Sequence, residues 1–373
     1  MKILLLSTYE KTGGAAIAAS RLLQALRHNG VDATMMCRKN ISVPWLRRLC
    51  PTLARKLEKQ SWTSIMERIV IWVCNGFSMK DLWATDIALF GQDITKTKEY
   101  KEADVIHLHW VNQGFLSLGN IRQFIRDGKK VVWTTHDAWN TMGAYHIARQ
   151  RRETLLERWT WMRKKKLYSL NKIQFVTCSR WLMDEVQSSP LTELLPVKAI
   201  PNPIDTDLFA PMENKTHARR VLFVAQDVHN SMKGMSYLDE AVKMLKGDDR
   251  VEVIALGRDI PYINNEEEMV QLYNSVDAFV LPSLSENLPN TIMEAMACGV
   301  PCVAFDVGGI PEMIDHKENG FLARFQNVED LAEGIRYVLN PDNHERLGKA
   351  AREKAVEQYS EKSVAQQYVE VYE

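Results

Sequence analysis

Short apolar runs alternate with longer amphipathic segments along most of the chain. The runs have the length of buried strands, and the segments between them repeat apolar positions at the spacing of helices. Strands separated by helices predict parallel sheets with both faces covered. The expected strands are residues 2–8, 33–37, 105–109, 131–135, 175–178 and 197–200 in the first half, and 221–225, 251–256, 278–282 and 300–305 in the second.

The helical segments are arranged similarly in both halves, except that residues 40–100 are rich in tryptophan and partly basic. The halves meet near residues 201–211, which predicts an α/β protein of two doubly wound, Rossmann-like domains facing a central cleft. We assign residues 1–210 to the first domain, 211–355 to the second and 356–373 to a helix that packs back on the first. The expected helices are residues 15–29, 121–127, 235–246, 266–274, 331–339, 344–359 and 361–372.

Two glutamates in the second half are the most informative polar residues. Glu286 lies in a polar loop, and Glu294 lies about a turn inside the helix that Pro289 and Asn290 open. The free N–H groups and positive dipole of a helix N-terminus suit a phosphate. Carboxylates are poor phosphate ligands but good acceptors for sugar hydroxyls. The local chemistry therefore predicts a phosphate with a sugar on either side, as in a sugar nucleotide.

The surroundings of this pair strengthen the interpretation. Two glutamates eight residues apart would otherwise be ordinary solvated acids on a loop and a helix. Here the expected strand 278–282 precedes them, Gly299 ends the helix, and the expected strand 300–305 follows. This order is a βαβ unit, in which ligands bind at the carboxyl ends of the strands.

Composition excludes several classes of protein. The 47 basic residues equal the 47 acidic ones, which argues against a nucleic-acid partner. The six cysteines form no C-x-x-C pair and no Cys/His cluster with zinc spacing, so we expect reduced cysteines and no metal site. Residues 1–7 are too short for a signal peptide, and the apolar run 69–74 is too short for a membrane span. We therefore expect a cytoplasmic protein, either soluble or peripheral on the inner face of the membrane.

Further motifs occur outside the glutamate segment. They are IPNPID at 200–205, GGIPE at 308–312, NGFL at 319–322, Gly13-Gly14, and the strand ends HLHW at 107–110 and HDAW at 136–139. Together they resemble the retaining, sugar-nucleotide-dependent glycosyltransferases of family 4, which have the GT-B fold. The resemblance covers nearly the whole chain, and the two histidine-containing strand ends resemble the branch that makes bacterial surface polysaccharides.

The resemblance implies specific roles for several residues. Glu294 would accept hydrogen bonds from the ribose, Glu286 would contact the transferred sugar, and Lys233 would pair with the diphosphate. Glu286 and His136, which would lie near the reacting carbon, are the expected catalytic residues. The other expected donor-binding residues are Gly13 and Gly14, which would leave space for phosphate and acceptor, together with Asn287, Leu288 and Asn290.

The chain departs from the family pattern at one position. The family often places an arginine after the strand that corresponds to 221–225, and here that position is Gln226. A neutral amide cannot form a charge-assisted pair with phosphate. We name Arg258, which follows the next expected strand, as a candidate substitute and donor-binding residue.

The expected reaction is a retaining, metal-independent transfer to a glycan or lipid-linked glycan acceptor. A helix dipole, backbone N–H groups and Lys233 can stabilise the leaving diphosphate without a metal. No Asp-x-Asp metal motif lies between the sugar and phosphate positions. The family resemblance implies that the departing phosphate oxygen takes the acceptor proton, with no protein nucleophile. The nucleotide-sugar is a substrate, so no cofactor is expected.

The histidines allow both structural and functional interpretations. Strand alternation places His107 and His109 on one face, with Leu108 on the other. We favour packing for His107, leave both interpretations open for His109, and favour function for His136 because it follows the carboxyl end of a strand. Gly308-Gly309 is equally compatible with a tight turn and with a functional role.

Two basic stretches with interleaved tryptophans, residues 38–68 and 149–172, lie in the half that receives the acceptor in this fold. They suggest docking on an anionic membrane surface. Solvated helix faces with core tryptophans are nearly as well supported. The residues are Arg38, Lys39, Trp45, Arg47, Arg48, Arg55, Lys56, Lys59, Trp62 and Arg68, then Arg149, Arg151, Arg152, Arg158, Trp159, Trp161, Arg163, Lys164, Lys165, Lys166 and Lys172.

Two other functions remain open at this point. Sugar-nucleotide epimerases share the two-domain architecture, and fold alone does not distinguish them from transferases. The glutamate pair and residues 202–205 favour transfer. A catalytically silent binding subunit is the third possibility, and Gln226 is the one residue that suggests it.

Overall fold

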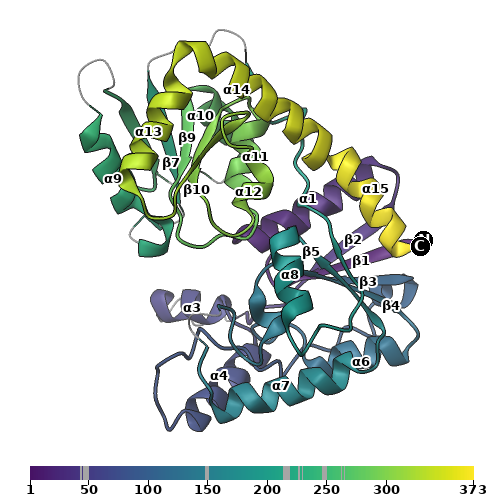
Figure 1. Ribbon diagram of the computed structural model, residues 1–373. Helices are drawn as coiled ribbons and strands as arrows, with labels where there is room; N and C mark the ends of the chain where they lie inside the picture. The colour runs from purple at the N-terminus through teal and green to yellow at the C-terminus, as the bar shows by residue number, and fades with distance from the viewer. Residues whose placement is uncertain are drawn as a thin grey trace. The chain divides into compact units, whose positions relative to one another are not determined.

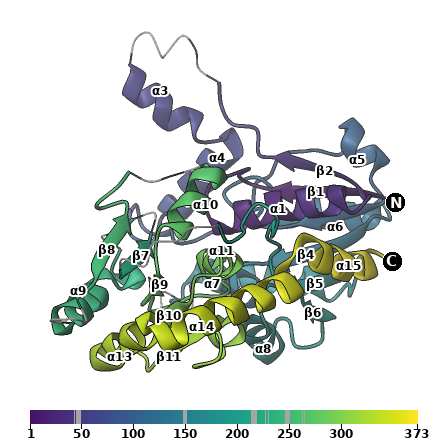
Figure 2. The same cartoon turned by 90° about the horizontal axis from the view of Figure 1, so that it is seen from above.

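The computed structural model describes residues 1–42, 44, 50–147, 151–212, 219–225, 227, 228, 230–245, 250–261, 263 and 265–373. The chain forms two compact units, each with its own parallel sheet (Figures 1 and 2). The first unit comprises Met1–Cys178, Leu182–Ile200 and Gln367–Glu373. The second comprises Ser179–Trp181 and Pro201–Gln366, so the end of the last helix belongs to the first unit.

The first unit contains a six-stranded sheet in the order β2-β1-β3-β4-β5-β6. Every neighbouring pair of strands in it is parallel. This arrangement requires a crossover between successive strands, and helices supply several of the crossovers. The strands are β1 (Lys2–Ser7), β2 (Asp32–Cys37), β3 (Val105–Leu108), β4 (Lys130–Thr135), β5 (Ile173–Thr177) and β6 (Val197–Ala199).

The second unit contains a five-stranded sheet in the order β11-β10-β9-β7-β8. Its paired strands are also parallel throughout. The order places β9 in the centre of the sheet, so the loop after β9 leaves from the middle of the carboxyl edge, where ligands bind in such sheets. The strands are β7 (Arg220–Val224), β8 (Glu252–Leu256), β9 (Ala278–Leu281), β10 (Cys302–Phe305) and β11 (Gly320–Ala323).

Helices cover both faces of each sheet. In the first unit, α6 and α7 lie on one face and α1 on the other; in the second, α9 and α13 lie opposite α10 and α11 (Figures 1 and 2). The helices up to residue 188 are α1 (Gly14–His28), α3 (Pro51–Glu58), α4 (Trp62–Cys74), α5 (Lys98–Glu102), α6 (Leu118–Arg126), η1 (Ala138–Thr141), α7 (Leu155–Tyr168) and α8 (Arg180–Ser188). Those that follow are η3 (Ser231–Lys233), α9 (Met235–Met244), α10 (Glu266–Asn274), α11 (Asn290–Ala297), α12 (Ile310–Met313), α13 (Val328–Leu339), α14 (Pro341–Lys354), the π-helical turn η5 (Ala355–Tyr359) and α15 (Glu361–Tyr372).

The observed strands match those expected from the hydrophobic pattern. Each expected strand is present within two residues at either end, because fully buried central strands read as continuous apolar runs. The pattern missed β11, which begins at a glycine and is only four residues long. It also gave no bounds for α7 or α8, and the region 40–100 contains the helices α3, α4 and α5.

Each sheet is packed around a hydrophobic core of its own. In the first unit, Trp133 of β4 and Phe175 of β5 stack at 5.8 Å and are buried together with Phe124 of α6. In the second unit, Phe223 of β7 and Phe305 of β10 are fully buried against α9 and α13. Close packing of these apolar faces fixes the positions of the loops at the carboxyl ends of the strands.

A buried hydrogen-bond chain attaches the end of α15 to the first sheet. His107 Nδ1 lies 2.7 Å from the Tyr372 hydroxyl, and His107 Nε2 lies 2.8 Å from Thr134 Oγ1. Thr134 Oγ1 in turn lies 3.0 Å from the Tyr368 hydroxyl. Burial, with a smaller effect of His136, lowers the pKa of His107 to about 3, so its imidazole is neutral. His107 therefore has a structural role, as its position in the strand predicts.

This contact generates a test of how α15 is held. Replacing Tyr372 with Phe keeps the ring but leaves His107 Nδ1 buried without its partner. We expect the Tyr372→Phe variant to lose about 1–3 kcal/mol of unfolding free energy, the cost of one unsatisfied buried polar group. Urea unfolding followed by tryptophan fluorescence measures the loss.

Tyr337→Phe is the matched control, because the Tyr337 hydroxyl accepts a long, exposed hydrogen bond of 3.4 Å from Arg346. This variant should lie within about 0.5 kcal/mol of the wild type. A Tyr372→Phe loss no larger than the Tyr337→Phe loss would show that the hydrogen bond does not hold the helix.

Candidate functional site

The loop between β9 and α11 leads directly into the N-terminus of a helix. α11 begins at Asn290 with Pro289 as its N-cap, and no side chain among the described residues caps it. Its first turn contains no acidic residue. The N–H of Ile292 donates to the carbonyl of Pro289 at 3.1 Å, whereas the N–H groups at the very start of a helix have no partner within it, and the helix dipole adds partial positive charge there. The end of α11 therefore suits an anion such as a phosphate.

Lys233 and Glu286 are in direct contact beside this loop. Lys233 Nζ donates to Glu286 Oε1 at 2.6 Å, with 35% and 13% of the side chains exposed. The backbone N–H of Leu284 donates to the carbonyl of Met232 at 2.8 Å, which aligns the two segments. Both residues were expected to bind a donor, and the structure brings them together. An ammonium group has three donors, so Lys233 can hold Glu286 and still contact a phosphate.

The contact depends on a glycine on the Lys233 side. Gly234 follows the short helix η3 with φ +74°, in the left-handed region. A Cβ atom at this position would lie 1.8 Å from the carbonyl oxygen of Pro282. Any other residue here would have a strained backbone and would clash with Pro282. Because glycine has no side chain, Lys233 can approach the Glu286 loop.

A second glycine pair supports the same loop from the other side. Gly308 has φ +59°, and a Cβ there would lie 1.8 Å from the carbonyl oxygen of Glu286. A Cβ at Gly309 would lie 2.2 Å from the carbonyl oxygen of Asn287. These residues form a tight turn after β10, and the turn packs against the backbone that presents Glu286. The structure shows the tight turn, and a functional role for this motif stays a prediction.

Glu294 projects from α11 and is fixed by an aromatic neighbour. Its side chain is buried, and its Oε2 accepts a 2.8 Å hydrogen bond from the hydroxyl of Tyr273 on α10. Tyr273 is itself fully buried. A carboxylate held in this way keeps one orientation, which favours directional hydrogen bonding to a ligand.

The remaining expected donor-binding residues of the loop are also held by side chains. Asn290 Oδ1 accepts a 3.0 Å hydrogen bond from Asn202, which lies in the segment between the two sheets. Asn287 Oδ1 accepts a 2.5 Å hydrogen bond from Ser179 Oγ. Leu288 is buried. The loop is therefore fixed at both of its asparagines.

Arg258 is engaged by two carboxylates. It forms a bidentate contact with Asp259, at 2.9 and 3.0 Å, and donates to Asp239 at 3.1 Å. These neighbours offset its charge, so the structure offers little support for Arg258 as a substitute phosphate-binding cation, and that role stays a prediction. Gln226 stands where the family often has an arginine, which led us to name Arg258, and it lies outside the described residues.

In the first unit, the glycines and His136 lie at the carboxyl ends of two strands. Gly13, which follows β1, has φ +88°, and a Cβ there would meet no described atom within 4 Å. Gly14 begins α1. His136 directly follows β4. Carboxyl ends of parallel strands share one edge of the sheet, so these residues belong to the edge where ligands bind.

His136 belongs to a chain of neutral, buried groups. Its Nε2 lies 3.0 Å from His109 Nδ1, and its Nδ1 lies 3.3 Å from Cys178 Sγ. Burial lowers the pKa of His136 to about 4, and burial and then His107 hold the pKa of His109 well below its usual range. The rings of His107 and His109 are 4.4 Å apart, which confirms that both face the same side of the sheet.

A second polar chain next to His136 carries charge instead. His146 Nδ1 lies 2.8 Å from Asp137 Oδ2, and His146 Nε2 lies 2.8 Å from Asp86 Oδ2. Burial alone would lower the pKa of His146, but the two carboxylates raise it to about 9. Sequence reasoning missed this bridge because His146 and Asp86 lie in irregular segments without periodicity. The nearest signal was Asp137, directly after His136.

Comparison with known sequences identifies the family. A family model described as Glycosyltransferase Family 4 matches residues 12–208, and one described as Glycosyl transferases group 1 matches residues 206–354. Over 278 residues the chain is 28% identical to the MMP alpha-(1->4)-mannosyltransferase of Mycolicibacterium hassiacum, with 67% of each protein covered. It is 32% identical over 169 residues to the N,N'-diacetylbacillosaminyl-diphospho-undecaprenol alpha-1,3-N-acetylgalactosaminyltransferase of Campylobacter jejuni, covering 41% of this chain and 44% of the relative.

The matches cover only part of the relatives, whereas the fold matches over the full length. Alignments with the first curated relatives span 33%, 67% and 44% of the relative's length. The sucrose-phosphate synthase of Thermosynechococcus elongatus superposes with a TM-score of 0.66 at 18% identity, covering 100% of this chain and 98% of that one. HepE of Anabaena, solved with UDP-glucose, superposes with a TM-score of 0.59 at 16% identity, covering 100% of this chain and 99% of that one. The expected family and fold class are confirmed: this chain belongs to glycosyltransferase family 4 and has the GT-B fold.

Proposed function

We propose that this protein is a retaining glycosyltransferase that moves a sugar from a nucleotide-sugar donor to a glycan or lipid-linked glycan in bacterial surface-polysaccharide synthesis. The observation that carries the proposal is the βαβ unit of the second sheet. Along this unit, Glu286 with its partner Lys233, the N-terminus of α11 and the buried Glu294 follow one another. A nucleotide-sugar has the same order of groups: ribose, diphosphate, sugar.

The second unit would bind the donor and stabilise the leaving group. Negative charge builds on the diphosphate as the bond to the sugar breaks, and preorganised cations and N–H groups lower the energy of that state. Lys233 and the first turn of α11 supply these groups. In this proposal they perform the reaction without a metal, and the departing phosphate oxygen takes the proton of the acceptor hydroxyl.

The two glutamates would hold the sugars at either end of the diphosphate. Glu294, oriented by Tyr273, would accept from the ribose hydroxyls. Glu286 would accept from the hydroxyls of the transferred sugar, while its bond to Lys233 keeps both groups near the phosphates. In the first unit, His136, neutral at physiological pH, is the second proposed catalytic residue, and Gly13 and Gly14 would leave room for phosphate and acceptor.

Related proteins support the choice of substrates. HepE, which shares the fold, was solved with UDP-glucose, and the names of two relatives specify alpha linkages. One of these names specifies a diphospho-undecaprenol acceptor, which is a lipid-linked sugar. These names favour a UDP-sugar as the first donor to test and an acceptor carried on a polyprenyl diphosphate.

The donor site can be tested by removing one charge at a time. A thermal-shift screen of UDP-, GDP-, ADP- and TDP-sugars identifies the donor, because a ligand stabilises the native state. Lys233→Gln should then weaken donor binding about 10- to 100-fold, the cost of losing a charge-assisted hydrogen bond. Glu294→Gln should weaken it by a similar factor. Isothermal titration calorimetry measures both.

Exposed residues of the same unit provide matched controls. Lys243→Gln on α9 and Glu333→Gln on α13 change the same charges on solvent-facing positions and should leave donor affinity unchanged. If Lys243→Gln lowered affinity as much as Lys233→Gln, the effect would be one of net charge, and the site would lie elsewhere. Conversion of the donor to an epimer in the absence of acceptor would replace the transferase proposal with an epimerase.

The pH dependence of transfer tests the state of His136. Because its pKa is about 4, the imidazole is neutral above about pH 5 and gains a proton as pH falls through 4. A positive charge there would oppose the positive charge that develops on the sugar. We expect kcat/KM to stay constant between about pH 6 and 8 and to fall toward pH 4.

His136→Gln keeps a neutral hydrogen-bonding group and removes the titration. It should lower the plateau rate about 10- to 1,000-fold and abolish any acid limb that depends on this residue. Circular dichroism at each pH separates this limb from acid unfolding. If the wild-type profile showed a kinetic pKa near 6.5 that His136→Gln lacks, the claim that His136 is neutral at physiological pH would be wrong.

A further inference from the structure

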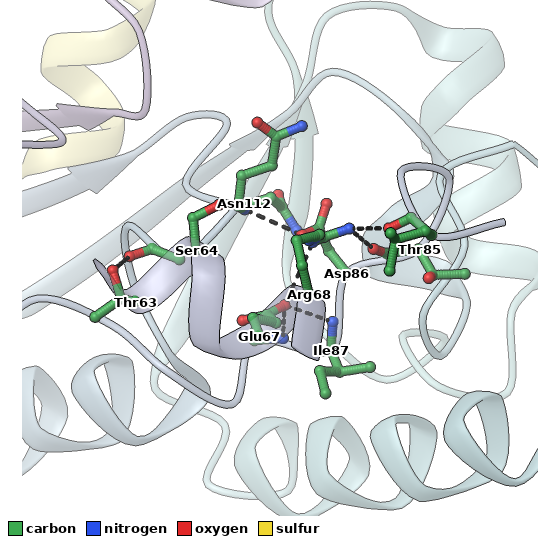
Figure 3. Close-up of polar contacts among 12 residues, drawn as sticks. Thr63, Ser64, Glu67, Arg68, Thr85, Asp86, Ile87 and Asn112 are labelled. Carbon is green, nitrogen blue, oxygen red and sulfur yellow. Dashed lines mark hydrogen bonds and ion pairs between the residues drawn. The ribbon is translucent and has the colours of Figure 1, made fainter. Parts of the chain in front are cut away.

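Helix α4 has its charged residues turned inward. Ser64 and Glu67 are fully buried, and Arg68 is 6% exposed. Arg68 forms an ion pair with Asp86 and donates to the carbonyl of Thr85 at 2.7 Å, while Glu67 accepts from the N–H of Ile87 at 2.9 Å (Figure 3). These contacts fix the helix to the segment 85–88 and determine which face points outward.

The outward face of α4 carries large apolar side chains. Trp62, Met66, Ile69 and Val73 are 70%, 46%, 47% and 48% exposed and recur at helical spacing along one stripe. A helix at the surface of a water-soluble protein normally shows the opposite arrangement, with apolar residues inward and charges outward. The inward salt bridge holds this stripe in place, so it cannot turn into the core.

The apolar surface continues beyond the end of α4. Phe77, Met79 and Trp83 are 64%, 66% and 55% exposed, and Phe77 packs edge-on against Trp72 at 4.9 Å. A hydrophobic cluster that includes Ile71 of α4 and Leu156 of α7 joins this region to the start of α7. Exposed apolar surface of this extent marks a site of interaction.

Helix α7 adds positive charge to the apolar surface. Leu155, Trp159 and Met162 are 85%, 40% and 63% exposed, and Lys165 and Lys166 are exposed in its last turn. The one acidic residue within α7, Glu157, is buried. The outward face of α7 therefore presents apolar and basic side chains with no compensating acid of its own.

We propose that α4, the segment 75–83 and α7 form a docking face for an anionic lipid bilayer. The apolar stripe of α4 would enter the boundary between headgroups and acyl chains, where tryptophan is favoured. The lysines of α7 would contact anionic headgroups. No helix among the described residues has the length and apolar character needed to cross a membrane, so contact is through the surface. The proposal goes beyond the transfer reaction and does not depend on it.

This face differs from the basic surface expected from the sequence. Arg38 is buried and donates to the carbonyls of Gln113 and Lys59, and Lys164 is fully buried against the carbonyls of Trp139, Met142 and Gly143. Arg68 is buried as described above. These three side chains are structural and cannot meet a membrane. Trp62, by contrast, is highly exposed. Arg47, Arg48, Trp45 and Arg149, and the side chain of Arg55, lie outside what the structure describes.

Charge complementarity favours a bilayer over a second copy of the chain. A two-fold interface brings identical patches together. The basic side chains of this face would therefore lie against the same basic side chains of the second copy and repel them. An anionic membrane satisfies both components at once. Its binding should weaken with salt, because exposed charges are screened.

Vesicle sedimentation tests the proposal with the intact chain. It should pellet with vesicles containing phosphatidylglycerol, bind much less to pure phosphatidylcholine, and release as salt is raised. Trp62→Ser combined with Ile69→Ser should weaken binding at least about tenfold through lost apolar burial. Lys165→Gln combined with Lys166→Gln should weaken binding to anionic vesicles about 30-fold.

Two controls separate docking from general changes in surface chemistry. Leu194→Ser removes an 87% exposed apolar side chain, and Lys98→Gln removes an exposed lysine on α5; both should bind as the wild type. Circular dichroism confirms that each variant is folded. The proposal is overturned if the wild type does not bind anionic vesicles at low salt, or if the control variants lose as much vesicle binding as the test variants. It is also overturned if light scattering shows a dimer that Trp62→Ser combined with Ile69→Ser dissociates.

Discussion

The contact between Lys233 and Glu286 is the interaction on which the candidate donor site depends. It joins η3 to the loop after β9, and it exists because two backbone segments approach more closely than side chains would allow. Gly234 lies against Pro282 on one side of that loop, and Gly308 lies against Glu286 on the other. The loop is therefore fixed in front of α11 by backbone contact, and the ion pair adds charge at a position already determined.

The first unit presents two polar chains of opposite character beside the same strand end. His109, His136 and Cys178 form a chain that burial keeps neutral. Asp86, His146 and Asp137 form a chain in which two carboxylates hold a protonated imidazole. Two histidines beside Asp137 therefore have pKa values shifted in opposite directions, that of His136 downward and that of His146 upward, a pattern common at functional sites.

Strand positions and the βαβ unit could be predicted from the sequence because buried parallel strands leave continuous apolar runs. The places of Glu286 and Glu294 followed from the helix start at Pro289 and Asn290, and α11 begins at Asn290. The ion pair of Glu286 with Lys233 could not be predicted, since it depends on the close approach at Gly234 and not on spacing along the chain.

The orientation of α4, with its charged residues inward and its apolar stripe outward, could not be predicted from the sequence for a related reason. Periodicity identifies an amphipathic helix but does not say which face is buried, and Glu67 and Arg68 face inward only because Asp86, Thr85 and Ile87 receive them. Lys164 on α7 is a second example. A run of basic residues predicts a solvated face, but Lys164 turns inward and donates to three carbonyl groups. Long-range polar contacts therefore determine the surface as much as the hydrophobic pattern does.

The most direct test of the central claim is a crystal structure with the nucleoside diphosphate that the donor screen identifies. The account predicts that the phosphates lie at the N-terminus of α11, within hydrogen-bond distance of Lys233 Nζ, with the ribose hydroxyls on Glu294. Phosphates bound elsewhere on the protein, with Lys233 and the start of α11 free of ligand, would contradict it.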